Sequence, residues 1–347
     1  MIDWRLAATV AQAVAAAAPA PPPGNGTTAA GVQAFAAESA ERVSAYTGLV
    51  SGLPLPDPET IDRSGWIGVN LHSMRSIMDP VAERAGVSLG VLAAPARAAA
   101  GVLLAVEIGV ISGYLAGRVL GQYEFPVLDP AAPARLLFVG PNLENAARNL
   151  GAEEDGMLRW VALHETTHAL QFTGVPWLRE HLAGRMRAVL AALDAAVDPR
   201  RLLRLPAADD VRGLVDAVRR GDLVQWVAGP ERAGLLEEVQ SLMALLEGYA
   251  EHVMDAVGAP ILPELDELRE AMNRRRRDRS GLLRVLEKVI GLDMKMRQYE
   301  DGKRFCDAVV AEGGIETLNR AWASADALPT AAELRAPSAW IDRVTAA

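Results

Sequence analysis

The stretch Met157–Phe172, MLRWVALHETTHALQF, reads as one apolar helix that carries two histidines, and the rest of the chain is interpreted around it. His164 and His168 are four residues apart, so both imidazoles lie on one face of the helix. A catalytic zinc ion keeps three protein ligands and a water, and imidazole nitrogens bind it at about 2.0–2.1 Å. Glu165 falls beside the pair, where its carboxylate can take a proton from that water. The pattern therefore predicts two zinc ligands and a general base.

The alternative is that both histidines are ordinary hydrogen-bonded core residues, because so short a motif also arises by chance. Two of only five histidines in the chain take this spacing, however, and the residues around them are apolar. Burying two imidazoles and a carboxylate there costs several kcal/mol unless something compensates, and a metal ion would do so. The metal site is the favoured interpretation.

Composition limits the classes of fold and partner. Half of the 347 residues are hydrophobic, only 5% are aromatic, and alanine with leucine dominates the apolar set, which favours helices. The formal net charge of −9 argues against general affinity for nucleic acid or an anionic membrane. A single cysteine, Cys306, excludes an internal disulfide and suits a cytoplasmic protein. We expect a mostly α fold with a small β-sheet (α+β).

The chain is expected to form a single domain over residues 1–347, with an N-terminal helix and a proline-rich linker in residues 1–26. The helix is expected over Trp4–Ala18 and the linker over Pro19–Gly26. The clearest strand is Arg135–Val139, to which Tyr123–Leu128 can pair. Further helices are expected over Trp177–Leu193, Glu237–Val257 and part of Leu282–Val310.

Local signals mark several helix ends. Asp57-Pro58 and Asp79-Pro80 each place an N-cap acid before a proline, which predicts helix starts. Thr330-x-x-Glu333 is a capping-box pattern for the last helix. Gly174 is expected to end the histidine-bearing helix as a C′ glycine.

The segment Ala98–Ala116 carries one charge, Glu107, and is long enough to span a bilayer. A central glutamate is costly in lipid, and glycines repeat every fourth residue at Gly109, Gly113, Gly117 and Gly121. Such a ridge of small residues lets a neighbouring helix approach closely in water as well as in lipid. We favour a central buried helix, with a membrane-associated protein as the weaker alternative.

The third metal ligand is open between two candidates. The metzincin class is excluded, because its glycine and third histidine would fall at Gln171 and Gly174. Glu247 on a later helix, with Glu251 one turn on, resembles the thermolysin-type arrangement, in which the first acid binds zinc and the second supports a ligand histidine. His181 is the competitor, because a tight turn after Gly174 could bring it level with His168.

Several short stretches spread over nearly the whole chain carry a resemblance to a known family. They are Asp3-Trp4, Asp62–Trp66, His164–Phe172, Pro176–Leu178, Leu246–Gly248, Val253–Asp255, Gly291–Asp293, Arg297–Tyr299 and Leu328–Thr330. With these residues the chain resembles a family of zincin-like metallopeptidases from actinobacteria and relatives that is associated with biosynthesis of the deazaflavin coenzyme. The resemblance implies a divergent, largely helical zinc hydrolase of the cytoplasm without a known substrate.

The resulting hypothesis is a zinc hydrolase that cleaves a peptide or related amide bond with a zinc-bound water. Zinc is the cofactor, His164, His168 and Glu247 are its ligands, and Glu165 is the catalytic base. Tyr299 or Arg297 is the candidate electrophile for the oxyanion, from the resemblance and its chemistry alone. The other class of answer is a zinc-bearing scaffold without activity, against which the intact Glu165 counts.

Overall fold

In the computed structural model of the chain, the described residues are 2–20, 29–88, 94–196, 230–262, 267, 269, 270 and 292–346. The chain divides into two compact units, residues 1–41 with 54–169 and residues 42–53 with 170–347. The boundary passes through two helices, α2 (Ala29–Thr47) and α6 (Glu154–Gly174). The single-domain organisation stays a prediction.

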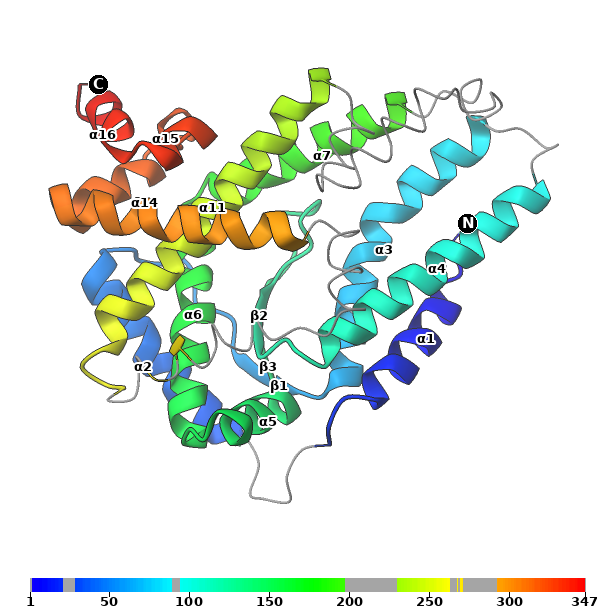
Figure 1. Cartoon of the computed structure of the whole chain (residues 1–347), viewed down its shortest axis with the longest axis horizontal. Coiled ribbons are helices and arrows are strands. Elements are labelled where there is room, and N and C mark those ends of the chain that lie inside the picture. The colour runs from blue at the N-terminus through cyan, green and yellow to red at the C-terminus, as the bar shows by residue number, and fades with distance from the viewer. Residues whose placement is uncertain are drawn as a thin grey trace. The chain divides into compact units, whose positions relative to one another are not determined.

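In the first unit, α1 (Trp4–Ala16) lies along α4 (Ala94–Ala116), as Figure 1 shows. A methyl group at Gly109 would lie 2.6 Å from the carbonyl oxygen of Ala7, and one at Gly113 would overlap the backbone of Ala11. The expected ridge of small residues is therefore confirmed over these two positions. Together with α3 (Arg63–Ser88), these helices bury an apolar cluster that includes Ala11, Ile67 and Ala105.

Helix α4 is less buried than the sequence predicts. Its segment Ala98–Ala116 is long and apolar enough to cross a membrane, by length and composition only, and a third of it is buried. Val102 and Leu103 are exposed, whereas Ala105 and Ala116 have no exposed surface. Because most of this segment is not buried within the part of the chain that the structure describes, the interpretation as a central buried helix is wrong.

The sheet has three strands in the order β1 (Pro58–Ile61), β3 (Arg135–Val139) and β2 (Gly121–Glu124). Strand β3 pairs parallel with β1 and antiparallel with β2. The mostly helical class with a small sheet and the strand Arg135–Val139 are thus confirmed. The partner strand begins earlier than the predicted Tyr123–Leu128, at Gly121. It also ends earlier, at Glu124, since Pro126 has no N–H to donate to a longer ladder.

Both helix starts predicted from Asp-Pro pairs are wrong. Pro58 opens β1, and α3 begins after Asp62, whose Oδ1 accepts a hydrogen bond from the Gly65 amide at 2.7 Å. Pro80 lies inside α3. The Asp79 carboxylate accepts a bond from Trp4 Nε1 at 2.8 Å and pairs with Arg75, so a contact far along the chain replaces the predicted cap.

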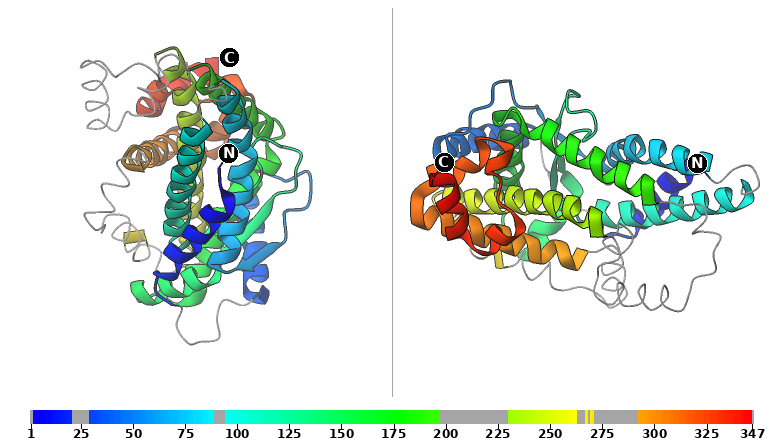
Figure 2. Two further views of the ribbon diagram at one scale, coloured as in Figure 1. Left: turned by 90° about the vertical axis from the view of Figure 1, so that its right-hand side faces the viewer. Right: turned by 90° about the horizontal axis from the view of Figure 1, so that it is seen from above.

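In the second unit, α7 (Leu178–Ala196) and α14 (Leu292–Asn319) pack against α11 (Pro230–Gly258). Figure 1 shows α14 crossing α11, and in the right-hand view of Figure 2 the two helices lie next to each other. They cross where a methyl group at Gly302 would overlap Ala244 and one at Gly248 would overlap Gly302. The two backbones touch at this crossing, next to Glu247. Residues 21–26 of the predicted linker and 282–291 of the predicted helix lie outside the described residues.

Helix α6 ends at Gly174 as expected, but the reason differs from the predicted left-handed C′ glycine. Its φ is not positive, in contrast to Gly48, Gly151 and Gly314. A methyl group at Gly174 would instead lie 3.2 Å from the carbonyl oxygen of Val50. The absence of a side chain at Gly174 thus allows a close approach of two chain segments rather than a left-handed turn.

The predicted capping box is present. Thr330 Oγ1 accepts from the Glu333 amide, and the Glu333 carboxylate accepts from the Thr330 amide at 2.9 Å. The capping box starts α15 (Ala331–Arg335), which is not the last helix because α16 (Pro337–Ala346) follows. Two short 3₁₀ turns, η2 (Arg320–Trp322) and η3 (Ala325–Ala327), precede α15. Arg343 of α16 donates to both Glu333 oxygens at 2.6 and 3.0 Å.

Glu333→Gln is expected to lower the free energy of unfolding by about 1 kcal/mol at pH 7. The hydrogen bond from Arg343 lowers the pKa of Glu333 from its ordinary value. Its stabilisation is therefore present above the unfolded-state pKa and is lost as the pH falls through the folded-state pKa. Urea denaturation at neutral and acidic pH measures this, with exposed Glu312→Gln as control. A difference that persists in acid would contradict the assignment.

Candidate metal centre

Helix α6 is held in the first unit by contacts that precede its histidines. The Arg159 guanidinium forms an ion pair with Glu38 and lies 4.1 Å from the ring centroid of Phe35, both on α2. The apolar residues Met157, Ala162 and Leu163 of α6 are fully buried. Helix α6 is thus held in the first unit by the packing of these apolar side chains and by the contacts of Arg159 with α2.

The two histidines of the motif face each other across one helical turn. Nε2 of His164 and Nε2 of His168 are 3.2 Å apart, and the ring planes are 86° to one another. Two nitrogens bound to a tetrahedral zinc at about 2.0–2.1 Å lie about 3.3 Å from each other. The pair therefore already has the separation that a shared metal ion requires.

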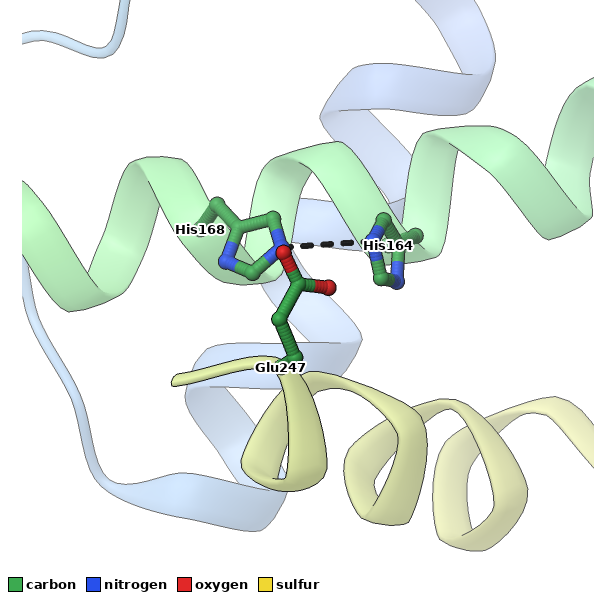
Figure 3. A group of neighbouring side chains, drawn as sticks. All are labelled: His164, His168 and Glu247. Atoms are coloured by element: carbon green, nitrogen blue, oxygen red, sulfur yellow. Dashed lines mark hydrogen bonds between the residues drawn. The ribbon is translucent and has the colours of Figure 1, made fainter. Parts of the chain in front are cut away.

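Glu247 of α11 supplies a carboxylate to the same place. One ligand atom from each of His164, His168 and Glu247 lies within 4.8 Å of the other two, and Figure 3 shows the three side chains converging. Among the described residues this is the one such group of three or more side chains. Two imidazoles and a carboxylate are a donor set that zinc takes in catalytic sites.

Within the second unit, the last turn of α6 is hydrogen-bonded to α11 directly before Glu247. Gln171 has no exposed surface, and its Nε2 donates to the carbonyl oxygen of Leu246 at 3.2 Å. Gln171 lies three residues after His168 on the same continuous helix, and Leu246 precedes Glu247. The hydrogen bond therefore holds the backbone before Glu247 against the last turn of α6.

Glu165 is held by the edge of the sheet. Its Oε2 accepts a hydrogen bond from the Tyr123 amide of β2 at 2.8 Å, and the residue is 7% exposed. A methyl group at Gly121 would lie 2.7 Å from Val161 Cγ1 and 2.8 Å from Glu165 Cγ. Strand β2 can thus approach α6 only with glycine at this position, and this approach fixes the carboxylate beside the histidines.

The remaining histidines lie elsewhere. The His181 ring packs edge-on against Trp177, and burial, with the nearby Arg185 charge, lowers its pKa. His252 is hydrogen-bonded on both sides, to Tyr46 and Asp307, each at 2.8 Å. His72 is exposed. None of these three belongs to the metal-capable group.

Three further candidates, Glu251, Tyr299 and Arg297, lie outside the group that could hold a metal ion, and their roles stay predictions. Glu251 lies one turn after Glu247 on α11 and is half-buried, as a residue that supports a ligand would be. Tyr299 and Arg297 lie on α14, but their side chains are outside the described part of the chain.

Sequence reasoning missed the glycines that set the site. Gly121 was interpreted as part of a helical series with Gly113 and Gly117, yet it opens β2 and packs on Glu165. Gly248 and Gly302 lie 54 residues apart, so no local pattern links them, although Gly248 directly follows a proposed ligand.

Comparison with known proteins agrees with this picture. A family model described as zincin-like metallopeptidase matches residues 2–341, and the chain belongs to this family. It is also similar to a solved structure from Chloroflexus aurantiacus, described as "a putative hydrolase with a novel fold". The two chains are 29% identical, with a TM-score of 0.72 over 99% of each chain. Among curated proteins, none matches.

Proposed function

We propose that the protein is a zinc-dependent hydrolase that cleaves a peptide or related amide bond. The observation that carries the proposal is the convergence of His164, His168 and Glu247, with Glu165 fixed beside them. A zinc ion held by these three residues would supply Lewis acidity toward a carbonyl and bring the pKa of a water to about 7. Family membership supports the metal and the reaction class.

Glu165 acts as the general base and then as the acid for the leaving amine. The Tyr123 amide bonds one carboxylate oxygen, which fixes the orientation of the group and leaves Oε1 for proton transfer. Because the carboxylate is largely buried, the proton moves in a site with little competing water. A structural metal site needs no such base, so a non-catalytic scaffold is the weaker proposal.

The electrophile for the oxyanion belongs to the same proposal. Tyr299 or Arg297 on α14 would donate to the developing charge. We also propose a cytoplasmic protein that binds neither nucleic acid nor membrane, from the net charge and the single cysteine. The association with deazaflavin coenzyme biosynthesis that the resemblance implies stays a prediction.

Glu165→Gln is expected to keep zinc and to lower hydrolysis by about 10²–10⁴-fold, because the amide cannot accept the proton. Zinc content is measured by mass spectrometry, and cleavage with a fluorogenic peptide library. Glu154→Gln, an exposed change in the first turn of the same helix, is the control and should match the wild type.

Loss of zinc from Glu165→Gln would mean that Glu165 is a ligand rather than the base. Cleavage equal to that of the wild type would exclude it from the reaction. A zinc-loaded wild type that cleaves no member of the library would favour the non-catalytic scaffold.

A further inference from the structure

The hydrogen bond that fixes Glu165 comes from β2, a strand of only four residues. Directly before this strand, the Val139 amide of β3 donates to the carbonyl oxygen of Leu120 at 2.8 Å. Hydrogen bonds to an antiparallel neighbour alternate along a strand, so the backbone of Gln122 faces β3, whereas the Tyr123 amide points away from it and reaches Glu165. The backbone ladder therefore holds β2 along one edge only.

The side chains of β2 alternate between its two faces. Gly121 packs on Glu165, and Gln122 points the opposite way, to α3. There the Gln122 Oε1 atom accepts hydrogen bonds from Trp66 Nε1 at 2.6 Å and from Asn70 Nδ2 at 3.2 Å. Its Nε2 atom donates to Asn70 Oδ1 at 3.1 Å. Three hydrogen bonds thus join this one side chain to a neighbouring helix.

The donors and acceptors of this cluster leave the Gln122 amide only one orientation. An indole N–H can only donate, so the atom that faces Trp66 must be the amide oxygen, and the amide nitrogen then faces Asn70. Trp66 is 4% exposed, and the Asn70 amide also donates to the carbonyl oxygen of Trp66 at 3.0 Å. The conformation of Gln122 is therefore fixed by a buried indole and by a reciprocal pair of amide bonds.

A further hydrogen bond from α3 lies at the end of the same strand. Glu124 is 6% exposed, and its carboxylate accepts a bond from Ser73 Oγ at 2.5 Å. Trp66, Asn70 and Ser73 are spaced by four and three residues, so they lie on one face of α3. Tyr123 stands between the two residues of β2 that this face holds. The position of its amide therefore depends on the packing of α3 against β2.

We propose that Gln122 is a positioning residue for the reaction, because its hydrogen bonds to Trp66 and Asn70 hold β2 where the Tyr123 amide orients Glu165. The inference rests on the proposed function and adds to it a residue that acts through the base. Catalytic groups must be held within about 0.5 Å of their productive geometry, and hydrogen bonds among the supporting residues provide this precision.

The first test needs no substrate and measures amide hydrogen exchange of the full-length protein by NMR. Gln122→Met keeps the length of the side chain but removes the amide oxygen and the amide donors. The exchange rate of the Tyr123 amide is expected to rise about tenfold, which is the local protection that one net hydrogen bond provides. Gln33→Met makes the same change on the exposed surface of α2 and should leave that rate unchanged. An unchanged rate in Gln122→Met would overturn the proposal.

The second test separates positioning from a general loss of structure. In zinc-loaded protein with a library peptide that the wild type cleaves, Gln122→Met is expected to lower kcat about tenfold at unchanged KM and zinc content. In a Glu165→Gln background the same change should have no further effect, because it acts only through that carboxylate. An equal loss of rate in both backgrounds would show a merely structural role and contradict the proposal.

A milder variant keeps the test decisive if Gln122→Met does not fold. Asn70→Asp removes the donor to Gln122 Oε1 and keeps the oxygen that accepts from Gln122 Nε2. It should change the Tyr123 exchange rate and kcat in the same directions by a smaller factor. Urea denaturation establishes which variants are folded. A folded Asn70→Asp that matches the wild type in both measurements would overturn the proposal.

The outcomes also separate this inference from the proposed function. If the zinc-loaded wild type cleaves no member of the library, the proposed function is wrong, and Gln122 has no catalytic base to position. If the wild type cleaves peptides and Gln122→Met has the same kcat, the proposed function stands and the positioning role of Gln122 alone is wrong.

Discussion

Replacing Glu247 by alanine is expected to lower the zinc affinity of the protein by several orders of magnitude. The change leaves His164 and His168 as the only two of the proposed protein ligands, whereas catalytic zinc sites keep three. Competition with a chromophoric chelator measures the affinity. His164→Ala and His168→Ala should each cause a loss of similar size.

Two further variants make this test specific. Glu251→Ala should weaken zinc binding by only about 10–100-fold, because it removes support for a ligand rather than a ligand. His181→Ala should leave affinity nearly unchanged, since its ring packs against Trp177 outside the metal-capable group. Zinc loss in His181→Ala together with retention in Glu247→Ala would show that the third ligand is misassigned.

Gly121→Ala is expected to lower hydrolysis about 100-fold while the protein still binds zinc. The added methyl would lie within 2.8 Å of both Val161 and Glu165, so the side chain of Glu165 must move. A shift of about 1 Å in a catalytic group can cost this factor in rate. The zinc ligands are on other residues and keep their positions.

Its control is Gly68→Ala in α3, where an added methyl meets no atom within 4 Å. This variant should keep full activity and gain a little stability from the better helix former. Urea denaturation of Gly121→Ala separates a displaced carboxylate from a failure to fold, since overpacking alone costs about 1–3 kcal/mol. Undiminished cleavage by Gly121→Ala would show that the contact between β2 and α6 does not position the base.

Much of the site could be predicted because its chemistry is local in sequence. The spacing of His164 and His168 places both imidazoles on one helix face, independently of the rest of the fold. Glu165 directly follows His164 in the same motif. The position of Glu247 one turn before Glu251 on an apolar helix predicts it as the third ligand. Its carboxylate belongs to the group that could hold a metal ion, and its role as a ligand stays a prediction. The His181 ring packs against Trp177.

The predictions that failed concern segments whose conformation is set by contacts with residues far along the chain. Asp79-Pro80 has the composition of a helix start, but Trp4, 75 residues away, bonds that carboxylate and α3 continues through the proline. Strand β1 has only four residues, begins with proline and is paired with β3. Its sequence is therefore too short to show the alternation of apolar and polar residues that marks a strand. By sequence, Gly121 continues the series of glycines at every fourth residue of the preceding helix. In the structure, it pairs with β3 and packs against α6 instead.

The most direct test of the account is a crystal structure of the zinc-loaded protein with anomalous diffraction collected at the zinc edge. The account predicts one anomalous peak, within about 2.0–2.2 Å of a nitrogen from His164, a nitrogen from His168 and an oxygen from Glu247. A peak bound by His181, or no peak at the histidine pair in protein that carries zinc, would contradict it.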